Sequence, residues 1–376
     1  MKKIFILTGE PSGDKLASIA ISQLKSQESN IEFLAVGGPH LKSVGVSSIY
    51  DLNEVTYLGF TNVLFNIFKI KKKFNDTVDE IVKYNPDILF SVDSPDFTLR
   101  VAKKVKLLKP NIKTIHFVAP KVYVWREHRV KKLKSFLDHI LLLFPFEKKY
   151  FDKENIKSTF VGHPLLDSSK KNNTDLSTLL NKNKKIVSIF PGSRLSEIIT
   201  LMPILINFIS LVQKEDNNFL FIFHSTIELK TTLKKYLSNS SIKNCEIVSD
   251  ENIKQNILSK TIFAIVKSGT ISLEICHAEV PSMIIYKMNF INFFIVKLLA
   301  KIRYANILNI VANSELIPEL LQSKCNPNKI YEIFNLYIKD SDRRKRQVIN
   351  CNKILNTMKI DIPAAKKIAD ILSKEI

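Results

Sequence analysis

Apolar runs and amphipathic stretches alternate along the first half of the chain. The runs are nearly continuous, as in Ile-Leu-Phe-Ser-Val at 88–92, which is typical of parallel strands that helices cover on both faces. Strands are predicted at residues 3–8, 32–36, 87–92, 113–118 and 140–144. Strands that alternate with helical patterns indicate an α/β unit built on a parallel sheet.

The composition changes near the middle of the chain. Residues 168–185 are rich in Ser, Asn, Asp and Lys, which is typical of an exposed linker. A second α/β series follows, with strands predicted at residues 186–190, 219–223, 246–248, 262–266 and 283–286. The 376 residues therefore fit two Rossmann-like domains, residues 1–167 and 186–355, and a substrate cleft is expected between them.

Further helices are predicted towards the C-terminus, at residues 315–322, 328–338, 341–355 and 364–374. Residues 356–376 are expected to contain a C-terminal helix that can pack back on the N-terminal domain. The helix at 341–355 carries the basic run Arg343-Arg344-Lys345-Arg346. This run favours a solvated helix face over contact with lipid or nucleic acid.

The chain carries 56 Lys and Arg residues against 36 Asp and Glu residues, a net charge of +20. This balance fits an anionic partner, such as nucleic acid, acidic lipid or a phosphorylated substrate, and it equally fits a general drift towards lysine. The basic residues are scattered and form no recognisable nucleic-acid-binding motif, so no nucleic-acid partner is expected.

Neither the four cysteines nor the histidines have the spacing of metal ligands, so no metal site is predicted. The short apolar run at the N-terminus leads directly into Gly9 and Glu10, which indicates a first strand rather than a signal peptide. No run of about 20 uninterrupted apolar residues is present, so any membrane contact is expected to be peripheral.

Two polar clusters follow strands of the first half, where ligands bind in parallel α/β sheets. The first cluster is Gly9-Glu10-Pro11-Ser12-Gly13-Asp14, in which Glu10 is expected at the ligand edge and Asp14 is expected to cap the following helix. The second is Asp93-Ser94-Pro95-Asp96-Phe97, whose two carboxylates suit general base work on a sugar hydroxyl. An Asx turn with a helix cap is the alternative for one of the two aspartates.

Two similar clusters follow strands of the second half. Pro191-Gly192-Ser193-Arg194 opens a helix, where backbone N–H groups and the arginine are expected to bind a diphosphate. Ser268-Gly269-Thr270 also precedes a helix, and Glu274 inside that helix can accept hydrogen bonds from ribose hydroxyls. For the first of these clusters the alternative is an ordinary loop, and for the second it is a helix cap with an exposed glutamate.

The spacing of Asp93 and Asp96 in the first half is not Asp-x-Asp, so it does not indicate a metal–diphosphate site.

Residues 58–70 form a strongly apolar stretch followed by lysines. Its predicted membrane contacts are Val63, Leu64, Phe65, Ile67, Phe68, Lys69, Lys71 and Lys72. This pattern resembles an interfacial segment with a basic collar on an anionic membrane, and a buried helix is the alternative. A second apolar stretch at 290–299 fits a core, an oligomer contact or a membrane contact equally well.

Taken together, the ordered clusters resemble the lipid-A-disaccharide synthase family nearly from end to end. The resemblance is carried by the clusters above and by Gly38-Pro39, Ile115-His116, Trp125-Arg126, Pro145-Phe146-Glu147, Gly162-His163-Pro164 and Pro318-Glu319. It implies a GT-B fold, with two Rossmann-like domains facing a central cleft, and an enzyme on the cytoplasmic face of a Gram-negative inner membrane. It also permits a homodimer.

The resemblance further implies a reaction. UDP-2,3-diacylglucosamine would give its sugar to the 6-hydroxyl of 2,3-diacylglucosamine 1-phosphate, with inversion and with no metal ion or other cofactor. Asp93 becomes the favoured general base, with Glu10 and Asp96 as the other candidates. Arg194 and Glu274 map to the diphosphate and ribose contacts, and Asn309 to a further contact with UDP on the C-terminal domain.

Two residues depart from the family pattern: Tyr123 stands where the family usually has Trp, and Leu308 stands where it usually has Pro before the asparagine. Neither change removes a charged or hydroxyl group that the reaction needs. Another GT-B enzyme acting on a UDP-sugar, a transferase or an epimerase, is the alternative. Such an enzyme would share the nucleotide site of the second half of the chain. Only the two clusters of the first half therefore distinguish it from the lipid-A-disaccharide synthase family.

Overall fold

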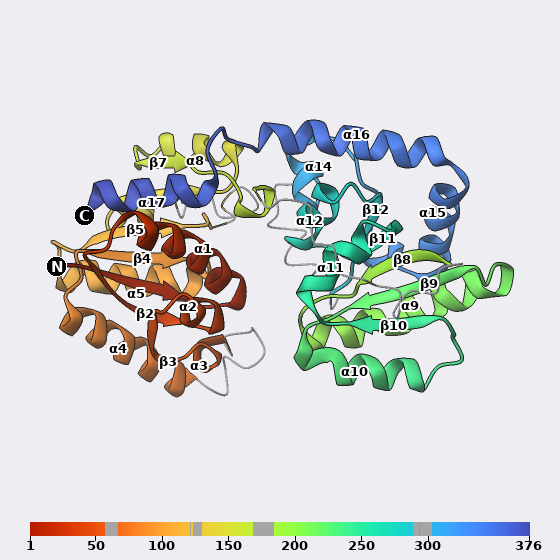
Figure 1. Ribbon diagram of the computed structural model, residues 1–376, viewed down its shortest axis with the longest axis horizontal. Helices are drawn as coiled ribbons and strands as arrows, with labels where there is room; N and C mark the ends of the chain where they lie inside the picture. Colours follow the sequence, from red (N-terminus) through yellow and green to blue (C-terminus); the bar gives the residue numbers. More distant parts are fainter. Residues whose placement is uncertain (57–66, 121, 123–129, 168–183, 289–292, 294–302) are drawn as a thin grey trace. The chain divides into compact units, whose positions relative to one another are not determined.

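The computed structural model describes residues 1–56, 67–120, 122, 130–167, 184–288, 293 and 303–376. The chain divides into two compact units (Figure 1). Unit 1 comprises Met1–Asp167 with Met358–Ile376, and unit 2 comprises Ser168–Thr357. Each unit contains a parallel sheet with helices packed against it.

The sheet of unit 1 has the order β3-β2-β1-β4-β5-β6-β7 among the described residues, and all its strand pairs are parallel. Its strands are β1 (Lys2–Thr8), β2 (Ile31–Gly37), β3 (Ser47–Asp51), β4 (Ile88–Val92), β5 (Lys113–Phe117), β6 (His139–Leu142) and β7 (Ser158–Phe160). Every residue of β4 is buried, because helices cover both faces of a central parallel strand.

The longer helices of unit 1 are α1 (Pro11–Gln27), α4 (Ile67–Tyr84), α5 (Pro95–Leu108) and α17 (Ala364–Glu375), and the shorter ones are α2 (Pro39–Ser43), α3 (Asn53–Thr56), α7 (Val130–Leu133) and α8 (Lys148–Asp152). Both α1 and α5 have proline in their first turn, where its missing N–H costs no helical bond. Both α1 and α5 bury one apolar face inside unit 1.

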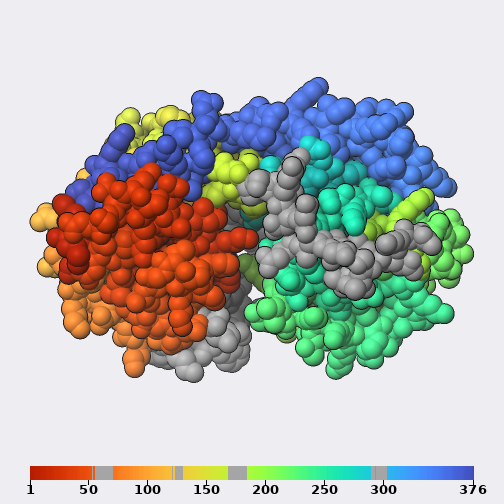
Figure 2. Space-filling view, viewed as in Figure 1, coloured from red at the N-terminus to blue at the C-terminus, as the bar shows by residue number. Residues whose placement is uncertain are grey.

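The C-terminal helix α17 belongs to unit 1, where it packs against α1 (Figure 1). Glu375 forms ion pairs with Lys113, at 2.9 Å, and with Lys157. At the other end of α17, the Ala364 N–H donates to Asp167 Oδ2 at 2.6 Å. The C-terminal residues consequently lie beside the N-terminal residues of the chain, as the blue and red surfaces in Figure 2 show.

Unit 2 has the strand order β10-β9-β8-β11-β12-β13 among the described residues, again with parallel pairs throughout. Its strands are β8 (Lys185–Phe190), β9 (Phe219–His224), β10 (Cys245–Val248), β11 (Thr261–Lys267), β12 (Ser282–Tyr286) and β13 (Glu319–Leu321). Its helices include α9 (Leu195–Glu215), α10 (Ile227–Ser238), α11 (Glu251–Leu258), α12 (Ile271–His277), α14 (Ile307–Ala312), α15 (Pro327–Lys339) and α16 (Ser341–Thr357).

Within the described chain, α9 is the helix that is long and apolar enough to cross a membrane, judged by length and composition alone. Its residues Leu201, Leu205 and Phe208 are buried in the core of unit 2. Phe334 of α15 packs edge-on against Phe208 and Phe219, with ring centroids 5.3 Å apart in both cases. These contacts are those of a core helix in a folded domain.

Both sheets have the strand order of a Rossmann fold, so each has a point where the order of connection reverses. In unit 1 this switch point lies between β1 and β4, and in unit 2 it lies between β8 and β11. Ligands of such sheets bind beyond the carboxyl ends of the strands at this point. Each unit therefore has one edge position where a site is expected.

The predicted α/β class with two parallel sheets is confirmed. The helix predicted at 315–322 is wrong, because residues 319–321 form β13, which pairs with β12. There the carboxylate of Glu319 accepts hydrogen bonds from the N–H groups of Ala305 and Asn306, both at 2.8 Å. These tertiary contacts outweigh the local helical pattern.

Candidate active site

The two N-terminal clusters meet at the switch point of unit 1. Thr8 and Val92, the last residues of β1 and β4, are partners in the sheet, so the loops that follow them are neighbours. Ser12 Oγ of the first loop donates to Asp93 Oδ2 of the second at 3.0 Å. Clusters that are about 80 residues apart in the chain thus form one structure.

Two glycines allow the loops to approach this closely. A Cβ atom on Gly9 would lie 2.7 Å from the Cβ of Ser94, and one on Gly13 would lie 2.9 Å from the carbonyl oxygen of Val92. Both distances are too short for real contacts, so the first loop can lie on the second only because these positions lack a side chain.

Asp93 sits at a strained and well-supported position. Asp93 and Ser94 have φ angles of 55° and 45°, and Val118, just beyond β5, has a φ of 75°. Left-handed backbone at non-glycine residues is costly and gathers at functional sites. Asp93 Oδ1 accepts the N–H of Ser94 at 2.8 Å, and Thr98 Oγ1 donates to the Asp93 carbonyl at 2.7 Å, so the turn and the carboxylate are held together.

The other two candidate bases lie differently. Asp96 is exposed in the first turn of α5. Glu10 is partly buried and takes the N-cap position of α1. The backbone of Asp93 is fixed at the carboxyl end of β4, because its N–H donates to the Phe117 carbonyl at the end of β5 at 3.0 Å.

Asp14 does not cap the helix that follows the first cluster, contrary to the prediction. It lies inside α1, is fully buried, and accepts hydrogen bonds from the N–H groups of Gly38, His40 and Leu41 at 2.7, 2.9 and 3.3 Å. It therefore fixes the start of α2. The aspartate of the first cluster and the Gly38-Pro39 pair are therefore linked structurally.

Two buried histidines of unit 1 are neutral at physiological pH. Burial lowers the pKa of His116 to about 3 and the pKa of His163 to about 4. His116 Nδ1 lies 2.8 Å from Ser91 Oγ, and His163 Nδ1 accepts the N–H of Leu165 at 3.2 Å. For His163 of the Gly162-His163-Pro164 cluster, this geometry favours packing over contact with a substrate.

The two clusters of the second half meet at the switch point of unit 2. Glu197 Oε2 accepts the N–H of Ser193 at 3.0 Å, and Glu197 Oε1 lies 2.7 Å from Lys267 Nζ, directly before Ser268. The loop after β8 and the loop after β11 are therefore linked by one carboxylate. Neither Glu197 nor Lys267 was predicted from the sequence, although an acidic residue in the first turn of a helix is a visible signal.

The glycines of these two loops have different roles. Gly192 has a φ of 123°, and a Cβ there would overlap the side chain of Glu197, so the fold requires glycine. At Gly269 a Cβ would meet only the Lys267 carbonyl oxygen, at 3.9 Å, which is an ordinary contact. Gly269 and Thr270 are both exposed, as are Ser193 and Arg194.

Glu274 is buried rather than exposed, which excludes the simple cap that was the alternative. Its Oε1 lies 2.6 Å from Lys254 Nζ and accepts a hydrogen bond from Gln255 Nε2 at 2.9 Å. Burial alone would lower the pKa of Lys254, but Glu274 and Glu251 raise it above its ordinary value. Nothing in the sequence signalled this network, because its members come from two different helices.

The hydrogen bonds of Asn309 do not support its predicted contact with the nucleotide. Its amide donates to the Ile317 carbonyl and to Glu319 Oε1, both at 2.8 Å. Its oxygen accepts the N–H groups of Leu316 and Ile317 at 2.9 and 3.0 Å. Both donors and both acceptor positions are therefore used inside the protein. Asn309 holds the segment beside Ser268, whose Oγ donates to the Ala305 carbonyl at 3.2 Å.

Most of the predicted membrane segment lies outside the described residues. Val63, Leu64 and Phe65 fall there, as do Tyr123, Trp125 and Arg126 of the family-like run and all of 290–299 except Phe293. Ile67, Phe68 and Lys69 belong to the first turn of α4, and Lys71 and Lys72 in the next turn are exposed.

The basic run in α16 has partners inside unit 2. Arg344 donates to the carbonyls of Tyr337 and Ile338 at the end of α15, the latter at 2.8 Å. Arg343 and Arg346 each lie 3.6 Å from Asp340. These contacts favour a structural role for the run over a contact with lipid or nucleic acid.

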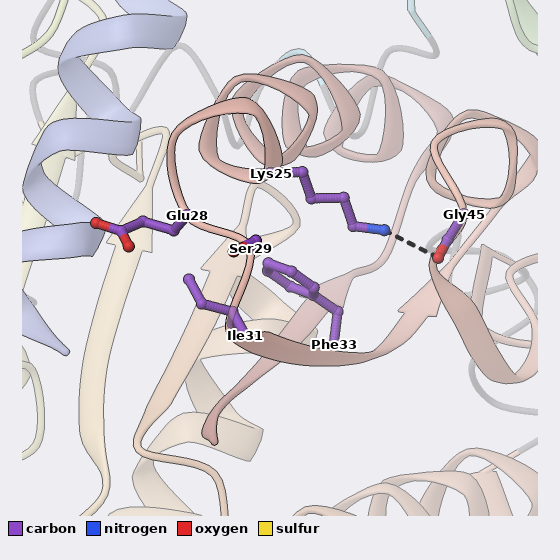
Figure 3. Close-up of a pocket in the computed structure, with 6 residues that line it drawn as sticks. All are labelled: Lys25, Glu28, Ser29, Ile31, Phe33 and Gly45. Carbon is purple, nitrogen blue, oxygen red and sulfur yellow. Dashed lines mark hydrogen bonds between the residues drawn. The ribbon is translucent and has the colours of Figure 1, made fainter.

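A hollow of about 380 Å³ on unit 1 is not part of this site (Figure 3). It lies between the end of α1 and the start of β2, where Ile31 pairs with Lys2. This is the amino end of the strands, whereas Asp93 lies at the carboxyl end. Lys25 crosses it to donate to the Gly45 carbonyl at 3.0 Å.

Among the described residues, no group of three or more His, Cys, Asp or Glu side chains could hold a metal ion.

Solved structures with a similar fold include enzymes of two kinds. A UDP-GlcNAc 2-epimerase of Neisseria meningitidis has a TM-score of 0.66 and 15% identity, over 100% of this chain and 99% of that one. A glycosyltransferase of Rickettsia africae has a TM-score of 0.59 and 13% identity, over 100% and 98%. At these identities the likeness shows the fold alone, which is GT-B.

The family is decided by sequence. The family model for lipid-A-disaccharide synthetase matches residues 4–371. A lipid-A-disaccharide synthase of Rickettsia prowazekii is 34% identical over 363 residues, which are 95% of this chain and 94% of that protein. One of Rickettsia typhi is 34% identical over 366 residues, or 96% and 95%. The chain belongs to the lipid-A-disaccharide synthase family of glycosyltransferases.

Proposed function

We propose that this enzyme transfers 2,3-diacylglucosamine from UDP to the 6-hydroxyl of 2,3-diacylglucosamine 1-phosphate. The products are a β-1,6-linked disaccharide 1-phosphate and UDP. The observation that carries the proposal is the pairing of the four clusters: two meet at the switch point of unit 1 and two at that of unit 2, within a chain of this family. Each switch point offers the edge where such sheets bind ligands.

In this proposal unit 2 holds the donor. The diphosphate lies against the exposed residues Ser193 and Arg194 at the start of α9, where the helix end and the guanidinium both favour negative charge. In the proposal, Gly269 lets the second loop approach the same phosphates, and Glu274 accepts hydrogen bonds from the ribose hydroxyls. Ser268 and Thr270 complete this loop.

Unit 1 supplies the base. Asp93 takes the proton of the acceptor 6-hydroxyl while that oxygen attacks C1 of the donor sugar, and the bond from C1 to the diphosphate oxygen breaks. The electron pair leaves on UDP, whose charge Arg194 and the N–H groups at the start of α9 stabilise. Attack opposite the leaving group inverts C1. Because these groups supply the charge stabilisation, the proposal requires no metal ion.

Both substrates carry acyl chains, so the enzyme must work at a membrane surface. We assign this contact to residues 58–70 and the exposed Lys71 and Lys72, as a peripheral attachment to an anionic inner membrane on its cytoplasmic face. The net charge of +20 favours attraction to such a surface.

The second candidate is another GT-B enzyme that acts on a UDP-sugar, such as an epimerase. The fold likeness to UDP-GlcNAc 2-epimerases favours it, and the family match weighs against it. It would use the same nucleotide loops and would not need the acyl acceptor.

A transfer assay tests the proposal. The purified protein is mixed with both lipid substrates in detergent micelles containing EDTA, and UDP and disaccharide phosphate are measured. Formation of both products is expected in EDTA. UDP binding without transfer would overturn the proposed reaction in favour of the second candidate, and activity that EDTA abolishes and Mg²⁺ restores would overturn the metal-independent mechanism.

A further inference from the structure

Lys267 ends β11 at the switch point of unit 2, surrounded by the elements of the proposed donor site. In the sheet, Val266 pairs with Phe190, the last residue before the Pro191–Arg194 loop, and Lys267 itself pairs with Ile285. The ring of Tyr286 lies 5.2 Å from Lys267 Nζ. Lys267 is thus at the edge where β8, β11 and β12 end together.

Glu197 holds this lysine in place. One carboxylate oxygen lies 2.7 Å from Lys267 Nζ and the other accepts the N–H of Ser193 at 3.0 Å. The side chains of Lys267 and Glu197 are 18% and 14% exposed, so the pair is largely desolvated and still open at one side. Burial raises the pKa of Tyr286, Glu197 raises it further and Arg194 opposes the rise, which places both charges near the same ring.

An ammonium group has three N–H donors, and the described residues provide Lys267 with one carboxylate, that of Glu197. A compact charge of this kind suits a phosphate oxygen. The ion pair lies between the loop after β8 and the loop after β11, which both face the diphosphate in the proposed donor site.

We infer that Lys267 is a second cation of the diphosphate site, beside Arg194, and that Glu197 is the residue that positions it. The inference rests on the proposed donor site in unit 2. It gives that site a preference for diphosphates, because Lys267 increases the affinity for UDP more than the affinity for UMP. It does not change the affinity for uridine.

The test is the affinity of the full-length protein for uridine, UMP and UDP, measured by calorimetry. Lys267→Met is expected to weaken the binding of UDP by about tenfold or more and the binding of UMP by less. It is expected to leave the binding of uridine unchanged. Lys267→Arg is expected to restore most of the UDP affinity because it keeps the charge. Lys260→Met, at the exposed residue directly before the same strand, removes the same charge and is expected to leave all three affinities unchanged.

The double variant Glu197→Gln with Lys267→Met leaves neither charge unpaired, so it guards against a loss of folding. It is expected to lose the preference for UDP as well. Equal weakening of all three ligands by Lys267→Met, or an unchanged UDP affinity in the double variant, would overturn the inference. Wild-type protein that binds no UDP would instead overturn the proposed donor site, and the inference with it.

Discussion

Single glycines separate what the fold requires from what a ligand requires. Gly9, Gly13 and Gly192 are each explained by a neighbouring group that a Cβ would overlap. Gly269 is not, since a Cβ there has ordinary space and its backbone is not left-handed. The close approach of a diphosphate in the proposed site supplies the missing reason.

This difference gives a paired prediction. Gly269→Ala is expected to leave the thermal midpoint unchanged and to weaken UDP binding, because the methyl group would stand where the diphosphate approaches in the proposed site. Gly192→Ala is expected to lower the free energy of unfolding by about 1–3 kcal/mol, because alanine cannot adopt its φ without strain. Calorimetry and thermal denaturation check both variants. An unstable Gly269→Ala protein, or one that binds UDP normally, would contradict the assignment.

At the residue scale, the sequence predicted where the polar clusters lie in the fold better than it predicted the role of each residue in them. Asp93 lies at the predicted strand end, with the supporting contact from Ser12. Asp14 and Asn309 are satisfied inside the protein, which spacing could not reveal because their partners lie on other elements. Glu197, Lys267 and Lys254 were missed for the same reason.

At the scale of elements, α17 attaches the C-terminus to unit 1 through a charged anchor. Its Glu375 pairs with Lys113 and Lys157, and His139 Nδ1 lies 3.5 Å from the same carboxylate. Hydrogen bonds from Lys157 and Lys113 lower the pKa of Glu375 from 4.5 to about 2. A carboxyl group with a lowered pKa stabilises the folded state while it is charged.

The anchor predicts a pH-dependent effect of Glu375→Gln. The wild-type advantage in stability should be complete above pH 4.5 and should fade as the pH falls towards 2, because the folded carboxyl then takes up its proton. Thermal midpoints of both proteins across this range test it. Glu332→Gln, an exposed residue of α15, is the control and should have little effect. A difference that persists unchanged at pH 2 would show that the charge is not its cause.

The elements that were predicted correctly from the sequence are those that contain continuous runs of buried apolar residues. The strands at the centre of each sheet match within about two residues, as β4 and β8 show, because an unbroken buried run has few other structures open to it. The strands β3 and β7 were missed because none of their residues is buried. For β13 the pairing with β12 decides the structure, and pairing across the chain leaves no local pattern.

At the scale of the whole molecule, the net charge of +20 and the apolar stretch at 58–70 belong to one hypothesis, that of a membrane-bound enzyme. The described part of the chain does not include residues 57–66, so the hypothesis rests on sequence and on the exposed Lys71 and Lys72. An experiment on the protein can separate it from the buried-helix alternative.

Phe65→Glu combined with Phe68→Glu is expected to weaken binding to anionic liposomes, because two charges would enter the acyl region. Co-sedimentation with the vesicles measures it, and circular dichroism checks the fold. Leu107→Glu with Leu108→Glu is the matched control, since these residues on α5 are 68% and 48% exposed in the same unit. Loss of folding in the first variant, or equal loss of binding in both, would favour the alternative.

The most direct test of the whole account is to measure turnover and UDP affinity on Asp93→Asn protein. Asparagine tolerates the left-handed backbone at this position, so the fold should survive. We expect kcat to fall by about 10²–10⁴ while the UDP affinity stays at the wild-type value, because the proposed base lies in unit 1 and the proposed donor loops lie in unit 2. Asp96→Asn should retain turnover. Near-wild-type turnover in folded Asp93→Asn protein would contradict the assignment of the base.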